Sequence, residues 1–274
     1  MGFIRRYISQ VAQSTHVRKA CRELLKSAKN ENHEQFLALA SGYVDLAQTY
    51  FGSSLQETDC LRASRTNQVF QGLWQNLRYA KRLSDFEYML AQALIESTPV
   101  DGPVGSQDQL ITKMRLLSPR TRFAFIAHEL ENWPLRYVCL VMRVKAPELH
   151  RLLSEARCEL CGISWESLAN EERACLEAIS ASLEKCPNPS ANRALFKRLS
   201  GFPRVSEIRS EWLSLRPELV EVRLRFIGDA RNREEILENI LRGICETSMQ
   251  EKPPLVDRLV NTVQFSRHAK INVS

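Results

Sequence analysis

Two cysteines near the middle of the chain have the spacing of a metal or redox site. Cys158 and Cys161 form a Cys-x-x-Cys pair, in which two thiolates can bind one zinc ion or close a disulfide. A structural zinc site needs four nitrogen or sulfur ligands, usually from two such pairs, and the sequence has one. We therefore predict no metal and no other cofactor, and interpret most of the eight cysteines as reduced, buried, small hydrophobic residues.

Patterns typical of catalysis are missing from the sequence. The five histidines form no His-Glu-x-x-His motif and no evident triad, and no glycine-rich phosphate loop occurs. Paired carboxylates such as Glu171-Glu172 and Glu234-Glu235 are typical of first helical turns, where the helix dipole favours negative charge. The sequence therefore predicts a binding protein that is not an enzyme and has no small-molecule substrate.

Positive charge is concentrated in two parts of a chain whose net charge is +6. Residues 1–30 carry seven Lys or Arg and one acidic residue, and residues 112–160 carry nine basic and five acidic residues. Two positive zones on a near-neutral body suit a polyanion such as nucleic acid. The alternative is two ordinary solvated helix faces.

Residues 116–160 predict three consecutive helices with short joints, the last two with the size of a helix-turn-helix. Such a motif can place its second helix in the major groove of DNA, although spacing alone is also compatible with a plain helical hairpin. The apolar residues predicted to be buried are Phe123, Phe125, Ile126 and Leu130, then Leu135, Val138, Cys139 and Met142, then Leu149, Leu152, Leu153 and Ala156.

Five side chains of this motif are the candidate DNA contacts. Lys145, His150 and Arg151 lie near the start of its last helix, where they could reach base edges. Arg136 and Arg143 are placed to contact phosphates. For each of the five, the alternative is an ordinary surface residue.

The rest of the chain predicts an all-α fold with a proline- and glycine-containing linker at 98–110. One short strand is expected at 219–227, where apolar and polar residues alternate. The predicted layout is an N-terminal helix at 1–33, a helical domain at 34–97, the linker, a helix-turn-helix domain at 111–162, and a mostly helical C-terminal domain at 163–274. Helices are predicted at 3–29, 34–51, 65–82, 85–96, 108–117, 119–131, 134–142 and 146–161.

The basic residues at the start of the chain could bind a membrane surface. Residues 3–29 predict an amphipathic helix, which packs on the body or, as the alternative, lies on a membrane surface. No run of eighteen apolar residues occurs, and no apolar segment follows the first arginines. We therefore predict a cytoplasmic protein with no membrane span and no membrane partner.

Two segments resemble the extracytoplasmic-function sigma factors of bacterial RNA polymerase. Residues 116–160 are similar to the promoter-binding C-terminal domain of that family, and residues 66–74 with 86–90 are similar to its core-binding and promoter-melting helices. The first likeness is carried by Leu117, Pro119, Arg120, Arg122, Glu129, Leu130, Glu131, Ala156, Arg157 and Leu160. The second is carried by Val69, Phe70, Leu73 and Trp74.

The resemblance implies two partners, RNA polymerase core and promoter DNA. The residues it implies for polymerase binding are Asn67, Gln68, Phe70, Gln71 and Trp74. Residues 163–274 have no counterpart in minimal members of the family, which suggests a regulatory or partner-binding role and a regulatory protein as a further candidate partner.

The chain departs from the family pattern at several positions. Ala63-Ser-Arg65 stands where acidic residues are usual, and Leu152 stands where a basic residue is common. Arg143 replaces the glycine of the tight turn, where a left-handed conformation costs about 1 kcal/mol. Glu148 and Glu155 lie on the last helix, where they would repel phosphate. The alternative function is therefore a sigma-like protein-interaction module, a regulator or adaptor that does not read DNA.

Overall fold

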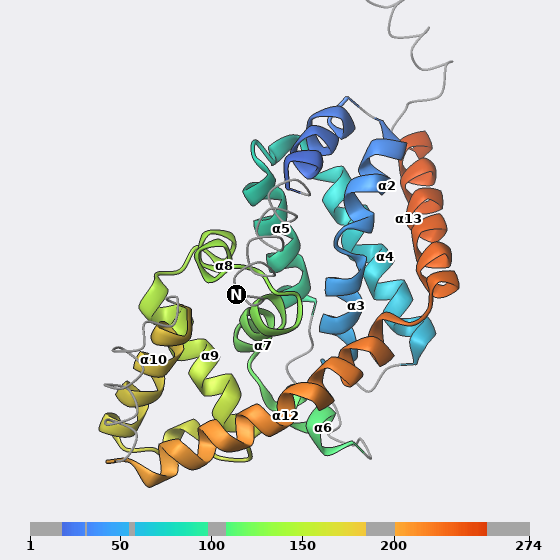
Figure 1. Cartoon of the computed structure of the whole chain (residues 1–274). Helices are drawn as coiled ribbons and strands as arrows, with labels where there is room; N and C mark the ends of the chain where they lie inside the picture. The colour runs from blue at the N-terminus through green and yellow to red at the C-terminus, as the bar shows by residue number, and fades with distance from the viewer. Residues whose placement is uncertain (1–17, 31, 55–57, 98–107, 185–200, 251–274) are drawn as a thin grey trace, which may run out of the picture.

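The computed structural model describes residues 18–30, 32–54, 58–97, 108–184 and 201–250. All regular elements of these segments are helical and none is a strand, which confirms the all-α fold (Figure 1). The helices are α2 (His33–Ser41), α3 (Val44–Gly52), α4 (Asp59–Gln75), η1 (Leu77–Tyr79), α5 (Leu83–Glu96), α6 (Gln109–Leu116), α7 (Pro119–Phe125), η2 (Ile126–Leu130), α8 (Leu135–Met142), α9 (Ala146–Leu160), η3 (Trp165–Ser167), α10 (Asn170–Glu184), α12 (Pro203–Ile227) and α13 (Ala230–Gln250).

The N-terminal part of the described chain is a bundle of short helices. A helix over residues 18–28 precedes α2, and the single helix predicted over 34–51 is two helices, because the chain turns at Gly42 and Tyr43. Phe36, Phe70 and Phe86 are fully buried between α2, α4 and α5. Residues 1–17, which include the first half of the helix predicted over 3–29, lie outside the described part.

Three features shape the segment between α6 and α9. The hydroxyl of Ser118 accepts from the N–H of Thr121, and Pro119 occupies the first turn, so α7 begins where the sequence predicts a helix start. Asn132 has a φ of 54°, which ends the helical segment before α8. Eleven of the twelve apolar residues predicted to be buried are buried, and Cys139 is half-buried.

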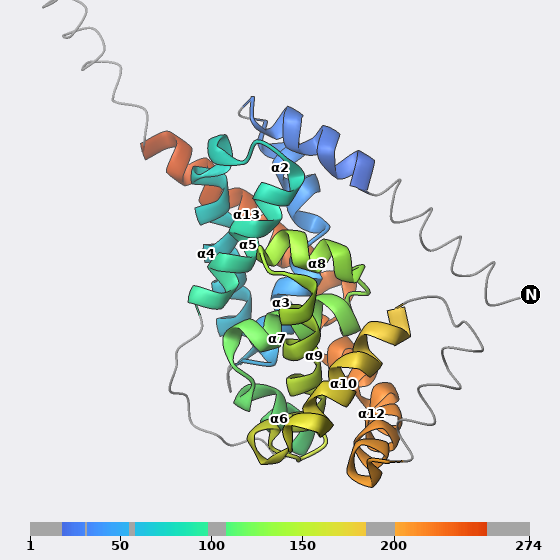
Figure 2. The ribbon, with the colours of Figure 1, turned by 90° about the vertical axis from the view of Figure 1, so that its left-hand side faces the viewer.

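The described residues of the C-terminal part form the long helices α10, α12 and α13. The strand predicted at 219–227 is wrong, because these residues form the end of α12. Leu219, Val222 and Phe226 are buried at spacings of three and four, which is the period of a helix face. Figure 1 shows α12 crossing the lower part of the molecule, and Figures 1 and 2 show α13 beside α2 and α4, with which it makes extensive contacts.

One large apolar core joins most of these helices. It contains buried residues of every helix from 18–28 to α9, of α12 and of α13, so the segments on both sides of residues 98–107 share it. A second, smaller core around Trp165 joins α9, η3, α10 and the start of α12. The domain boundaries named above stay a prediction. Among the described helices, none has both the length and the apolar character that a bilayer crossing needs.

Candidate nucleic-acid and protein interface

A three-residue turn joins α8 to α9 and gives the pair the form of a helix-turn-helix. Arg143 has φ 55° and ψ 44°, the left-handed conformation expected of it from the sequence. The N–H groups of Arg143 and Val144 both donate to the carbonyl oxygen of Cys139, so a carbonyl in the last turn of α8 has hydrogen-bond partners. Lys145 is the residue before α9, and Pro147 lies in its first turn.

A buried arginine holds α7 against the end of α6. Arg122 is 3% exposed, and its guanidinium donates to the carbonyl oxygens of Met114 at 3.0 Å, Arg115 at 2.7 Å and Leu117 at 2.8 Å. The three carbonyls lie at the C-terminal end of α6, where donors within a helix run out, although the carbonyl of Met114 also accepts from the N–H of Leu117. A cation at a helix C-terminus also interacts favourably with the helix dipole. Arg122 is one of the residues that carry the family likeness, and its contacts are internal.

Two other residues of the likeness are joined in a buried ion pair. Glu129, in η2, accepts from the guanidinium of Arg157 on α9. Arg157 also donates to the hydroxyl of Ser180 on α10 at 2.6 Å. Despite its burial, the positive charge of Arg157 holds the pKa of Glu129 below its ordinary value. The ion pair therefore joins η2 to α9, and the hydrogen bond from Arg157 to Ser180 joins α9 to α10 in the C-terminal part of the chain.

The five predicted DNA contacts have different surroundings. Arg136, Arg143, Lys145 and Arg151 are exposed, and His150 is half-buried. The guanidinium of Arg143 lies 3.6 Å from the ring centroid of Tyr88 on α5, and Arg151 forms an ion pair of 2.9 Å with Glu155. The start of α9 thus carries Lys145 and Arg151 on its open surface, while Arg143 is held against α5.

Only the first turns of α9 are open to a ligand. Leu152, at the position where the family commonly has a basic residue, is 3% exposed and belongs to the main core. Ser154 is buried and shares a hydrogen bond of 2.9 Å with Ser180, because α10 packs along this part of α9. Glu148, in the first turn, pairs with Arg120 at 3.1 Å and so lowers the net charge that DNA would meet.

Two of the five residues predicted to bind polymerase are core or near-core residues. Phe70 is fully buried, and the half-buried ring of Trp74 packs against His33 at 4.9 Å and Phe36 at 5.2 Å between ring centroids. Their role in the fold is to hold α4 against α2. This packing accounts for the apolar part of the family likeness in α4.

The other three predicted polymerase contacts are polar residues of α4. Gln68 is exposed, whereas Asn67 and Gln71 are half-buried. Asn67 and Gln71 are one helical turn apart and therefore share a face of α4. On this face Gln71 touches Gly243 of α13, so α13 lies directly against it.

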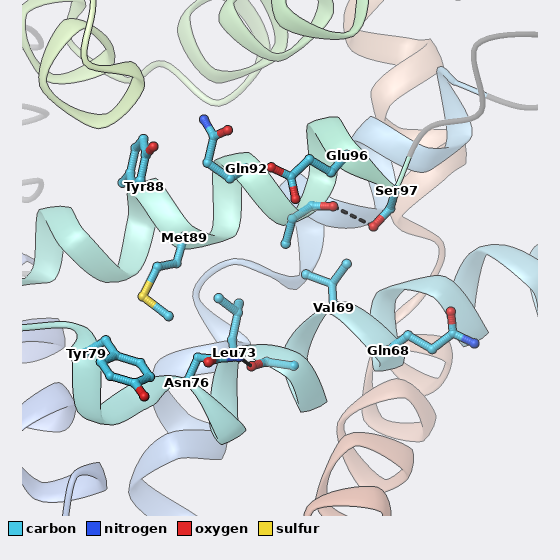
Figure 3. Close-up of a pocket in the computed structure, with 12 residues that line it drawn as sticks. Gln68, Val69, Leu73, Asn76, Tyr79, Tyr88, Met89, Gln92, Glu96 and Ser97 are labelled. Carbon is cyan, nitrogen blue, oxygen red and sulfur yellow. Dashed lines mark hydrogen bonds between the residues drawn. The ribbon is translucent and has the colours of Figure 1, made fainter.

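A groove of about 610 Å³ lies between α4 and α5 (Figure 3). Val69, Leu73, Met89 and Ala93 form its apolar floor, and amide and tyrosine side chains stand around it. Aromatic rings can stack on bases, and amides can donate to and accept from base edges. The polar residues of its lining are Gln68, Asn76, Tyr79, Tyr88, Gln92, Glu96 and Ser97.

The two tyrosines of this groove do not belong to the sites predicted from the sequence. Tyr79 is 61% exposed, and the guanidinium of Arg78 lies 4.9 Å from its ring centroid. Tyr88 lies under Arg143. In the sequence, Tyr79 follows the apolar stripe of α4 without continuing it, which is a weak signal because single exposed aromatic residues are common on protein surfaces.

The Cys-x-x-Cys pair lies inside the second core. Cys158 is buried and Cys161 is half-buried, with its thiol 3.6 Å from the carbonyl oxygen of Ile208. Burial raises the pKa of Cys158 to about 12 and that of Cys161 to about 11. The described residues contain no group of three or more His, Cys, Asp or Glu side chains that could hold a metal ion.

We expect Cys158 to react slowly with iodoacetamide in the native protein. Its thiol is buried and rarely ionised, whereas Cys60 is exposed, so labelling of Cys158 should be at least about a hundredfold slower at neutral pH. Peptide mass spectrometry over a time course measures both rates, and labelling in urea shows that both thiols are intact. Equal native rates would mean that the second core opens readily.

The geometry offers two binding surfaces, the open first turns of α9 and the surface of α4 with its groove. No protein-family model, curated protein or solved structure was found to match the chain. What these surfaces bind therefore has to follow from their own chemistry, which is basic at α9 and aromatic and amide-rich beside α4.

Proposed function

We propose that the chain is a sigma-factor-like transcription factor of a bacterium. In this proposal residues 34–97 bind RNA polymerase core, residues 111–162 bind promoter DNA, and the mechanism is binding without turnover. The protein would act in the cytoplasm, where both partners are found. The family likeness of the two segments suggests this function, and the arrangement of α8 and α9 is the observation that carries it.

Two features of the pair α8–α9 support major-groove binding. A short left-handed turn at Arg143 separates the two helices, and the first turns of the second helix are open with Lys145 and Arg151 on their surface. In helix-turn-helix proteins the N-terminal residues of the second helix contact base edges. From Leu152 onward α9 is mostly buried against other helices, and base contacts in this mode of docking do not involve that part of the helix.

The groove between α4 and α5 supports the polymerase and promoter half of the proposal. Tyr79 offers an exposed ring for stacking, and Gln68 and Gln92 offer amides for base edges. This combination suits unpaired bases, which expose their faces and edges once a duplex has opened.

The first test measures whether the intact chain associates with purified core polymerase. Gln68→Arg is expected to weaken this association, and Ser206→Arg, on α12, is the control. No association with core polymerase, either of the intact chain or of variants that detach α13 from α4, on which it packs, would sink the proposal.

Binding of the intact chain to a mixed-sequence DNA duplex should weaken steeply as salt is raised. Lys145→Ala should lower the slope of log K against log salt by about 1, because one phosphate contact and its released counterion are lost. Fluorescence anisotropy at several salt concentrations measures the slope. Arg231→Ala removes an exposed cation from α13 and is the matched control. A slope unchanged by Lys145→Ala would argue against α9 as the DNA-binding helix.

The second candidate is a sigma-like protein-interaction module that does not read DNA. The observation in its favour is that cations near α9 already have partners in the protein, Arg151 with Glu155 and Arg120 with Glu148. Such a module would bind its partner through apolar surface, with little dependence on salt. The salt series therefore discriminates between the two candidates, since only phosphate binding predicts a steep slope.

A further inference from the structure

Helix α13 packs on α4 and α2 through an apolar stripe. Ile236, Ile240 and Ile244 recur one turn apart and are each at most 1% exposed, in the same core as the aromatic residues of α2 and α4. The opposite side of the helix is exposed at Glu234, Glu238 and other charged residues. The segment is thus an amphipathic helix bound to the rest of the bundle (Figure 1).

A glycine lets this helix approach the polar face of α4 closely. A Cβ atom at Gly243 would overlap the side-chain amide of Gln71. Glycine inside a helix costs about 1 kcal/mol relative to alanine, so its place here has a packing reason. One turn before Gln71, the side-chain oxygen of Asn67 is buried. The polar face of α4 that is implied in polymerase binding is therefore covered by α13.

The joint before α13 separates it from an anchored helix. Arg223 and Arg225 tie α12 to Glu131 and Asp108 with ion pairs of 2.7 Å each. Gly228 follows, with a φ of 68° and a ψ of −162°, a conformation that other residues rarely adopt. Rotation at this joint would move α13 while α12 stays in place, although Arg233 of α13 also pairs with Asp45 at 3.6 Å.

We propose that α13 is a built-in competitor that occupies the polymerase-binding face of α4 and has to leave before core polymerase binds. This inference rests on the proposed function, since it concerns regulation of the same face. Apparent affinity then equals the affinity of the open form multiplied by the fraction of molecules that are open. Weakening the packing of α13 on α4 and α2 raises the open fraction and so lowers the apparent Kd for core polymerase.

The test uses two substitutions in the full chain. Gly243→Leu places a bulky side chain against Gln71, and Ile240→Asp places a charge in the core contact, so both should release α13. Glu246→Leu adds a leucine at an exposed position of the same helix and is the control. Hydrogen exchange of residues 59–75 reports uncovering of α4, circular dichroism reports the rest of the fold, and titration with core polymerase reports affinity.

The expected result is faster exchange in α4 together with an apparent Kd about tenfold lower for both release variants, with no change for Glu246→Leu. Faster exchange with an unchanged or higher Kd, in a chain that binds polymerase, would overturn the competitor role and leave the proposed function standing. Unchanged exchange in both variants would show that α13 does not cover α4. Faster exchange with no polymerase binding in any form would sink the proposed function and this inference with it.

Discussion

Arg122→Ala is expected to lower the free energy of unfolding by about 3–5 kcal/mol. The guanidinium serves three buried carbonyl oxygens, those of Met114, Arg115 and Leu117, and each would lose a charge-assisted hydrogen bond. The substitution also leaves a cavity between α6 and α7. Urea denaturation followed by circular dichroism measures the loss.

Two further variants separate the causes. Arg122→Lys keeps the positive charge but replaces a planar fork with one ammonium, which cannot reach three carbonyls in the same geometry, so it should recover less than half of the loss. Arg120→Ala removes a neighbouring arginine that is exposed and pairs with Glu148, and should cost less than about 1 kcal/mol. A similar loss for Arg120→Ala and Arg122→Ala would show that the carbonyl contacts of Arg122 contribute little.

Helix periodicity predicted the part of the fold that is local. Leu149, Leu152 and Leu153 recur at spacings that place them on one face of α9, and each is at most 3% exposed. The left-handed conformation of Arg143 was implied by the family resemblance, because the family usually has glycine at this turn. Where two periods fit equally well, as for the alternating residues of 219–227, the local pattern misled, and long-range packing of Leu219 and Phe226 favours the helix.

Contacts between distant segments could not be predicted in this way. Nothing local to α4 indicates that Gln71 meets Gly243, and nothing local to the turn of the helix-turn-helix indicates that Arg143 stacks on Tyr88. The same holds for Glu87, a charged residue beside Phe86 that periodicity would place near the surface. These pairings depend on how the helices assemble, which spacing within one helix does not determine.

Glu87 has the most unusual environment of the described carboxylates. It is 2% exposed on α5, and the hydroxyl of Tyr43 donates to it at 2.7 Å. Burial raises its pKa to about 7, although the hydrogen bond from Tyr43 and the positive charges of Arg18 and Arg22 act in the opposite direction. Arg18 itself lies over the ring of Tyr137, 3.0 Å from its centroid, so the helix over 18–28 closes this cluster.

The stability of the protein should therefore fall as the pH rises through neutrality. A carboxyl whose pKa is higher in the folded than in the unfolded state stabilises the fold below its unfolded pKa, near 4.5, and loses this contribution as the pH passes its folded pKa. Between about pH 5 and pH 8.5 the contribution of Glu87 should fall by about 2–3 kcal/mol, since each tenfold change in proton affinity is worth about 1.4 kcal/mol.

Glu87→Gln isolates this contribution, because the amide is neutral at every pH and can still accept from Tyr43. The unfolding free energy of the variant minus that of wild type should rise by about 2–3 kcal/mol between about pH 5 and pH 8.5. Urea denaturation of both proteins at each pH measures this difference. Glu96→Gln removes an exposed carboxylate from the same helix and is the control. Parallel curves for Glu87→Gln and wild type would mean that Glu87 is already ionised in the folded protein at pH 5, with the helix over 18–28 supplying the compensating charge.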